Sequence, residues 1–276
     1  MSSGRYPFES SEAERQRLVA QGELVAPLTE RLFARAGVAA RMRVLDLGSG
    51  AGDVALIAAH IVGPQGSVLG VDRDPAQVAF AQRRAKDAGF TNVSFQAGDF
   101  REIELAREVD AIVGRLVLMY APDPLDALKR ALRHLRPGGV IALQESIVDY
   151  EAPVLIEPPG CLAAHAAEWF RAGFRHARVQ PRMGLRLFGL MHDAGLEPSI
   201  EIETLLPLQQ GPDGALFATL TSVVRSQLSA ILASGVATEQ VIDIDTLEQR
   251  MTDDAPASGV VGYFNLGHVG VWARKP

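Results

Sequence analysis

Between about residues 42 and 145, short apolar segments alternate with stretches of helical periodicity. We expect the apolar segments to be strands at 43–47, 68–71, 93–96, 111–113 and 140–144. The helices between them are expected at about 53–62, 75–88 and 124–135. Short strands that alternate with helices predict an α/β fold, in which helices cover both faces of a parallel sheet.

Outside this region the alternation is less regular. Residues from about 10 to 38 are expected to form two amphipathic helices that meet near Gly22. After Gln144 the regular pattern stops, and a proline-rich loop is expected at 149–160. The remaining elements are expected as helices at 161–178, 184–194, about 214–233 and 238–250, with strands near 199–206 and at 269–273.

The segment from Val44 to Asp53 reads VLDLGSGAGD and carries the clearest chemical signal. A strand, a glycine-rich turn and a helix start form a corner in which backbone approaches a nucleotide closely and free N–H groups face it. The glycines follow a Gly-x-Gly-x-Gly pattern, whereas a dinucleotide fingerprint requires Gly-x-Gly-x-x-Gly. Asp46 precedes the loop, where it would repel a phosphate and suit an ammonium or sulfonium group.

The Asp-x-Gly-x-Gly-x-Gly pattern resembles motif I of the class I S-adenosylmethionine-dependent methyltransferases, and the Arg136 to Gly139 turn is typical of their small-molecule members. The resemblance implies a Rossmann-like seven-stranded sheet in the order 3-2-1-4-5-7-6, with strand 7 antiparallel, helices on both faces and a helical lid. It also implies S-adenosylmethionine as the cofactor. The motif I residues expected to bind it are Asp46, Gly48, Ser49, Gly50 and Gly52.

Acidic residues at the ends of the next two strands extend this site. Asp72 lies about 20 positions after the glycine loop, where a carboxylate accepts hydrogen bonds from ribose hydroxyls. Asp99 and Phe100 match the adenine-binding segment of the family, which implies that the Asp99 carboxylate and the Phe100 backbone N–H contact the ring. Arg73 and Arg115 complete the expected cofactor-binding set, although Arg115 is equally suited to an acidic substrate or a salt bridge.

The acceptor site is much less defined by the sequence. Glu145 and Tyr120 follow strands at the carboxyl edge of the sheet, where open α/β sheets bind ligands. In the helix at 161–178, His165, Trp169 and His176 recur at spacings that place them on one face. We therefore consider the two histidines, Glu145 and Tyr120 as catalytic candidates. Trp169 and Tyr150 are candidates for substrate binding, and an ordinary packing stripe is the alternative for the helix.

Composition limits the partners. The chain has 276 residues and a net charge of −6 without a basic block, so we expect no nucleic-acid partner. Cys161 is the single cysteine, which excludes an internal disulfide and fits a reducing compartment. The first residues lack an apolar signal region, and no run approaches the roughly 18 apolar residues of a membrane span. We thus expect a cytoplasmic protein without a metal site, either a monomer or a homodimer.

These observations predict one methyltransferase domain over 1–276. Its parts are a helical cap at 1–40, a cofactor-binding core at 41–145, a substrate or lid insertion at 146–180, and the second half of the sheet at 181–276 with a helical insertion at 211–252. The expected reaction is methyl transfer from S-adenosylmethionine to an O or N atom of a small molecule. The alternatives are an RNA or protein acceptor, or a cofactor-binding protein of this fold with a non-methylating role. An NAD-dependent oxidoreductase is disfavoured by the glycine spacing and by the lack of a recognisable Tyr-x-x-x-Lys pair.

Overall fold

The computed structural model describes residues 12–147, 154–177, 179–180, 182–205, 208–211, 215–264 and 266–276. These residues form two compact units. The first, here called the sheet unit, contains residues 18–147, 182–203 and 268–276. The second, the helical unit, is built from the described parts of 1–17, 148–181 and 204–267. The stretches expected as separate insertions at 146–180 and 211–252 thus contribute mainly to one unit.

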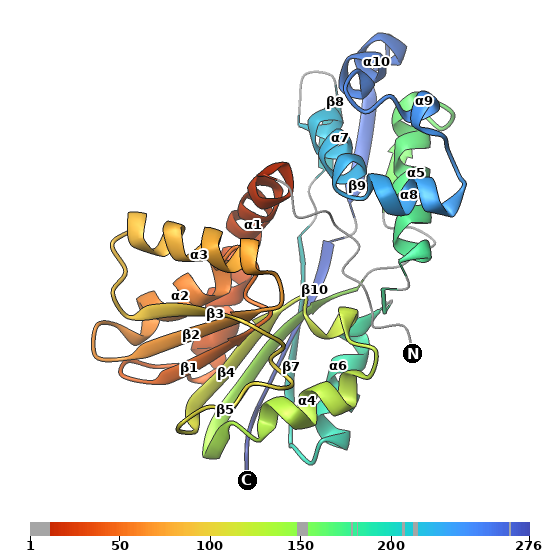
Figure 1. Ribbon diagram of the computed structural model, residues 1–276. Helices are drawn as coiled ribbons and strands as arrows, with labels where there is room; N and C mark the ends of the chain where they lie inside the picture. The colour runs from red at the N-terminus through yellow and green to blue at the C-terminus, as the bar shows by residue number, and fades with distance from the viewer. Residues whose placement is uncertain are drawn as a thin grey trace. The chain divides into compact units, whose positions relative to one another are not determined.

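The sheet unit is organised around a seven-stranded sheet in the order β3-β2-β1-β4-β5-β10-β7 (Figure 1). Its strands are β1 (Arg43–Leu47), β2 (Ser67–Asp72), β3 (Val93–Ala97), β4 (Val109–Arg115), β5 (Leu135–Ser146), β7 (Ser199–Leu205) and β10 (Leu266–Arg274). The first five strands pair in parallel, and β10 pairs antiparallel to β5. Since β7 and β10 are the sixth and seventh strands of this sheet along the chain, the expected 3-2-1-4-5-7-6 order with an antiparallel last strand is confirmed.

Helices cover both faces of this sheet. They are α1 (Glu12–Ala36), α2 (Asp53–Val62), α3 (Pro75–Asp87), the 3-10 helix η1 (Leu118–Tyr120), α4 (Pro124–Leu132) and α6 (Met183–Asp193). Buried residues of α1, α2 and α3 form one hydrophobic core with side chains of the sheet, among them Phe33, Ala58 and Val113. On the opposite face α6 approaches β5 and β10, because a Cβ atom on Gly184 would lie 2.9 Å from the carbonyl oxygen of Glu145.

The N-terminal helix differs from the prediction. The expected two helices are one helix, α1, which runs through Gly22 and Pro27. Gly22 is a point of close approach rather than a break, because a Cβ atom there would lie 2.5 Å from Cγ of Asp53 at the start of α2. Glycine therefore lets α1 pack directly over the first turn of α2.

The helical unit contains five helices and a small sheet among the described residues. The helices are α5 (Leu162–His176), α7 (Leu216–Ser226), α8 (Leu228–Ser234), α9 (Glu239–Ile242) and α10 (Leu247–Asp254). The three-stranded antiparallel sheet has the order β6 (Val154–Glu157), β9 (Val260–Phe264), β8 (Leu208–Gly211). Its core contains apolar side chains such as Ala166, Leu220 and Ile231.

This unit corrects two predictions. The expected loop at 149–160 contains strand β6, which pairs with β9 more than 100 residues later in the chain. The single helix expected at 214–233 is divided at Gln227 into α7 and α8, which are bent by 71°. Within the described residues no single helix is long and apolar enough to span a membrane, and the bent α7–α8 pair meets that criterion by length and composition only.

Candidate functional site

The glycine loop joins β1 to α2 in a conformation that requires glycine. Gly48, Gly50 and Gly52 have φ angles of +61°, +49° and +91°, in the left-handed region that other residues rarely adopt. The backbone N–H of Ser49 donates to the carbonyl of Val71 in β2 over 3.0 Å, which fixes the loop beside the second strand. The α2 N-terminus opens directly onto this loop, as the sequence predicts for a nucleotide-binding corner.

Asp72 binds the glycine loop through its side chain. Its Oδ2 atom accepts from the Gly50 N–H over 2.8 Å, and its Oδ1 atom accepts from the Asp74 N–H over 2.9 Å. Burial raises the pKa of Asp72, and these two backbone hydrogen bonds oppose that shift. A carboxylate has about four lone-pair positions, so both oxygens can accept a further hydrogen bond from a ligand.

Asp46 is buried beneath the loop with a side chain that is 1% exposed. Neither of its carboxylate oxygens has a hydrogen-bond partner among the described residues. Burial raises the pKa of Asp46 well above its usual value, although the nearby Arg115 lowers it. A buried carboxylate without a donor favours a cationic ligand, because leaving such a group unpaired costs free energy.

Asp99 lies next to Asp72 but already has a partner that the sequence did not indicate. The Gly98 N–H donates to the Asp72 carbonyl over 2.8 Å, which joins the two turns. The Arg101 guanidinium forms a close, two-pronged ion pair with the Asp99 carboxylate, and Nε of Arg73 lies 3.8 Å from its Oδ2. Burial would raise the pKa of Asp99, but hydrogen bonds from Arg101 outweigh it and lower that pKa. The neighbouring Phe100 side chain is buried.

A polar network joins α1, α2, β4 and β5 on one face of the sheet. Nη1 of Arg115 donates to Oγ1 of Thr29 over 3.2 Å, and Thr29 donates to Oε1 of Gln144 over 2.7 Å. Nη2 of Arg115 lies 3.8 Å from Oδ2 of Asp53. Burial lowers the pKa of Arg115, while Asp53 and Asp46 oppose that change.

A second arginine, Arg84 of α3, also contacts the loop. Its Nη1 atom donates to the Ala51 carbonyl over 2.6 Å and to Oδ1 of Asp53 over 2.8 Å. Sequence analysis missed Arg84, Thr29 and Arg101, because an arginine or threonine on a helix or turn carries no local signal of a distant partner. Asp53 was recognised only as the helix start.

Near the carboxyl end of β5, Glu145 is completely buried. Its Oε1 atom accepts from the N–H groups of Val117 and Leu118 over 2.9 and 2.6 Å. Burial raises the pKa of Glu145 to about 7, and these hydrogen bonds oppose the rise. The carboxylate of this catalytic candidate is therefore a buried group that accepts hydrogen bonds from the backbone. Tyr120, at the end of η1, is half-buried.

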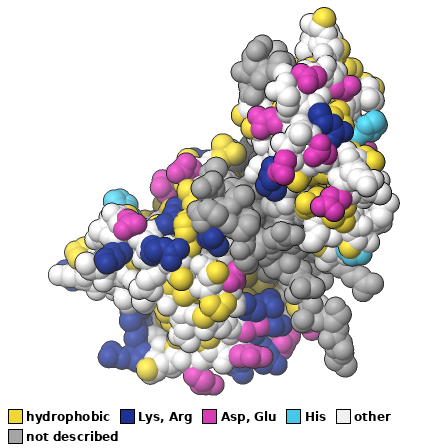
Figure 2. Space-filling model, turned by 45° about the horizontal axis from the view of Figure 1, so that its top comes forward, with side chains coloured by type: hydrophobic (Ala, Val, Ile, Leu, Met, Phe, Trp, Pro, Cys, Tyr) yellow, Lys and Arg dark blue, Asp and Glu magenta, His cyan; other side chains and the backbone are white. Residues whose placement is uncertain are grey.

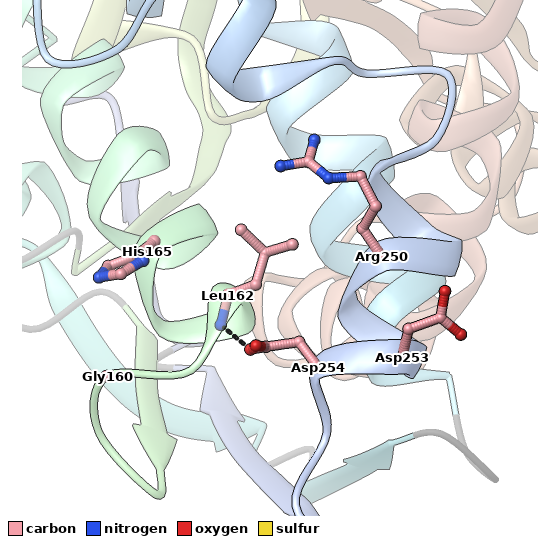
Figure 3. A pocket seen from close by; sticks show the side chains of 6 residues that line it. All are labelled: Gly160, Leu162, His165, Arg250, Asp253 and Asp254. Carbon is pink, nitrogen blue, oxygen red and sulfur yellow. Dashed lines mark hydrogen bonds between the residues drawn. The ribbon is translucent and has the colours of Figure 1, made fainter.

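The three residues expected on one face of α5 do not share one environment. Trp169 is buried in the core of the helical unit, whereas His165 and His176 are exposed. The burial of Trp169 among the helices agrees with the packing-stripe alternative rather than with substrate binding. His165 lines an open depression of about 510 Å³ together with Leu162 and Asp254 (Figure 3). Oδ2 of Asp254 accepts from the Leu162 N–H there over 2.6 Å. Tyr150 lies outside the described residues. In the described part of the chain, no group of three or more His, Cys, Asp or Glu side chains could hold a metal ion.

A sheet in the order 3-2-1-4-5-7-6 with a glycine loop after β1 and acidic residues after β2 and β3 defines the class I methyltransferase architecture. Two solved structures share it. A methyltransferase-like protein from Bacillus halodurans aligns with a TM-score of 0.58 and 17% identity, covering 90% of this chain and 98% of that one. A [4+2]-cyclase, SpnF, aligns with a TM-score of 0.55 and 19% identity, covering 91% and 81%.

Sequence comparisons agree with this architecture. A family model described as "Methyltransferase domain" matches residues 39–178, so the chain belongs to this methyltransferase domain family. An arsenite methyltransferase from Aquipseudomonas alcaligenes is 41% identical over 115 residues, which are 39% of this chain and 33% of that protein. A trans-aconitate 2-methyltransferase from Azoarcus sp. is 36% identical over 140 residues, 49% of this chain and 52% of that protein. The chain thus spans only a third to a half of these relatives.

The cofactor of this class is S-adenosylmethionine, and the described residues fit its chemical groups. The unpartnered Asp46 carboxylate suits its ammonium group. The free lone pairs of Asp72 suit ribose hydroxyls. The Asp99 carboxylate, although paired with Arg101, keeps acceptor positions for the adenine amino group.

Proposed function

We propose that this protein is an S-adenosylmethionine-dependent methyltransferase that transfers a methyl group to an O or N atom of a small molecule. The observation that carries the proposal is the junction of Asp46, Gly50 and Asp72 at the carboxyl edge of β1 and β2. One carboxylate is buried without a partner, and the other is bound to the glycine loop and can still accept hydrogen bonds. These two acids match a ligand with a cationic amino-acid end and a ribose.

Bound S-adenosylmethionine supplies a methyl group on a sulfonium, with a neutral thioether as its leaving group. The chain's own residues then have to bind, orient and exclude water, which are the main sources of rate in such an in-line transfer. In this proposal Asp72 orients the ribose, Asp46 binds the ammonium group and Asp99 the adenine. Tyr120, His165 and His176 remain candidates for acceptor binding or proton removal, and Tyr120 has the added support of its position at the carboxyl edge.

Three observations support a small-molecule acceptor over RNA or protein. The net charge is −6, and on the face in Figure 2 basic side chains are interspersed with acidic ones. The exit of β4 reads Gly114-Arg115-Leu116-Val117, without the Asn-Pro-Pro-Tyr sequence typical of enzymes that methylate amino groups of nucleic acids. Two similar proteins are named for small molecules, arsenite and trans-aconitate.

A thermal shift assay with S-adenosylmethionine, S-adenosylhomocysteine and NAD tests the cofactor assignment. Ligand at 100 times its Kd should stabilise the protein by about 2.7 kcal/mol. The two adenosyl ligands should raise the Tm and NAD should not; a shift with NAD alone would overturn the proposal.

Transfer of a labelled methyl group then tests the reaction, because the fold also serves a [4+2]-cyclase. Incubation of the protein and labelled cofactor with metabolite extracts should give labelled small molecules. Cofactor binding without any transfer would favour the non-methylating alternative. Label in RNA or protein fractions alone would favour a macromolecular acceptor.

A further inference from the structure

The segment that follows β4 presses against the glycine loop. A Cβ atom on Gly48 would lie 2.7 Å from Cγ2 of Val117 and 3.3 Å from its Cβ. The Val117 side chain therefore occupies the space that a side chain at Gly48 would need. Because Gly48 belongs to the loop that binds the cofactor in our proposal, a displacement of Val117 would alter the support of that loop.

The backbone of this segment is strained. Leu116 has a φ of +55°, in the left-handed region, which is unfavourable for an L residue with a side chain. Its N–H donates to the Gln144 carbonyl over 2.8 Å. Such a conformation persists only where neighbouring contacts hold it.

Glu145 supplies those contacts. A single oxygen, Oε1, accepts from the next two backbone N–H groups, those of Val117 and Leu118. The second oxygen, Oε2, is buried and has no partner among the described residues. Retaining a buried carboxyl with one unsatisfied oxygen is unfavourable for stability. A need to hold this segment would account for that cost.

We propose that Glu145 is a positioning residue that holds residues 116–118 in their strained conformation and thereby seats Val117 against Gly48. It acts on the cofactor loop through Val117, without contact to a reacting atom. The inference rests on the proposed function of the glycine loop as the S-adenosylmethionine site. It assigns Glu145 a different task from the proton transfer that its sequence position suggested.

The test compares Glu145→Ala, Glu145→Gln and Leu143→Ala. Glutamine keeps an oxygen that can accept both N–H groups, whereas alanine removes it. Leu143 is a matched control, because it is also fully buried on β5, two residues earlier and on the same face of the strand. Hydrogen exchange of the peptide that contains residues 116–118 reports the backbone directly, without ligand. Titration calorimetry measures the affinity for S-adenosylhomocysteine, which in our proposal depends on the glycine loop.

Glu145→Ala should speed hydrogen exchange in residues 116–118 and weaken the binding of S-adenosylhomocysteine about tenfold or more. Glu145→Gln should keep both the exchange rate and the affinity at their wild-type values. Leu143→Ala should lower the Tm while leaving the affinity within about threefold of the wild type. Folded Glu145→Ala with wild-type exchange and affinity would overturn the inference. So would an equal loss of affinity in Leu143→Ala, since this would reflect general destabilisation.

Val117→Ala keeps the inference testable if Glu145→Ala does not fold. It removes the methyl groups that contact Gly48 and leaves both hydrogen bonds to Glu145. It should weaken S-adenosylhomocysteine with exchange in residues 116–118 unchanged, and unaltered affinity would count against the proposed coupling. A wild-type protein that fails to bind S-adenosylhomocysteine would instead refute the proposed function, whatever the exchange data show.

Discussion

The backbone N–H of Gly50 donates to Oδ2 of Asp72 over 2.8 Å, so one carboxylate holds the glycine loop against the end of β2. The other oxygen binds the N–H of Asp74 at the start of α3. Each oxygen thus accepts one hydrogen bond from the backbone and keeps another acceptor position for a ligand. This arrangement joins the structural and the binding role of Asp72 in one side chain.

Asp72→Ala should weaken the binding of S-adenosylmethionine by about 100-fold or more, because hydrogen bonds to a charged acceptor contribute roughly 1.5–3 kcal/mol each. The loss of two backbone contacts should lower the Tm without unfolding the protein. Calorimetry measures the affinity and circular dichroism the fold. Asp87→Ala, an exposed carboxylate at the end of α3, is the control and should bind normally. Wild-type affinity in Asp72→Ala would place the ribose elsewhere.

Asp46→Asn should stabilise the ligand-free protein and weaken the binding of the cofactor. The raised pKa of Asp46 means that its carboxylate costs stability once the pH exceeds its usual value of 3.8. Asparagine has the same shape and no charge, so the ligand-free variant should unfold at a higher urea concentration than the wild type at pH 7. Urea unfolding with and without S-adenosylmethionine measures both effects. A variant that is less stable when ligand-free, or that binds as tightly as the wild type, would contradict this role.

Glu145→Gln should gain stability relative to the wild type as the pH rises. The folded-state pKa of Glu145 is about 7, against a usual value of 4.5. Between pH 4.5 and pH 7 the native protein keeps a proton on Glu145 that the unfolded chain has lost. The contribution of Glu145 to wild-type stability is therefore fully present below pH 4.5 and is lost as the pH rises through 7. The difference between the two proteins should grow by about 3 kcal/mol from pH 4.5 to pH 8. Urea midpoints at several pH values measure it, and a constant difference would argue against the shift.

His268 should show the opposite dependence. It is buried in β10, neither ring nitrogen has a partner among the described residues, and burial with the nearby Arg115 lowers its pKa to about 4 from 6.5. The unfolded chain binds the proton first, so stability is present above pH 6.5 and is lost as the pH falls through 4. His268→Gln should gain about 3 kcal/mol relative to the wild type over that range. If the two proteins lose stability in parallel on acidification, His268 is not the responsible group.

Thr29→Val should break the link between α1 and the sheet. Valine has the shape of threonine but would leave Oε1 of Gln144 without its donor and Nη1 of Arg115 without its acceptor. A loss of about 1–3 kcal/mol in the free energy of unfolding is expected. Thr29→Ser keeps the hydroxyl and serves as the control. Equal stability of the two variants in urea would show that the network contributes little.

The regular part of the fold could be predicted because its signals are local. Strands β1, β2 and β4 are short apolar runs, and helices α3 and α4 begin after Asp74 and Asp123, whose side chains accept from backbone N–H groups as N-caps. The small sheet of β6, β9 and β8 could not be predicted, because its strands lie far apart in sequence and only their pairing identifies them. Gly22 suggested a break because its close approach to Asp53 is visible only once α1 and α2 have packed.

The candidate site divides in the same way. Glycine spacing and acids at strand ends are readable in the sequence, and the structure brings Gly50, Asp72 and the turn of Asp99 together. The residues that surround them, such as Arg84 and Arg101, come from helix positions and turns with no motif. Burial is likewise a property of the whole fold, so the surroundings of Glu145 and Trp169 could not be inferred from their places in the sequence.

The position of β10 has a consequence for biosynthesis. This strand comes last among the elements of the sheet, yet it lies between β5 and β7 in the interior of the sheet. During synthesis on the ribosome, the edges of β5 and β7 that pair with β10 stay without that partner until residues 266–274 emerge. A nascent chain halted before β10 would expose those edges, which are templates for pairing with another chain.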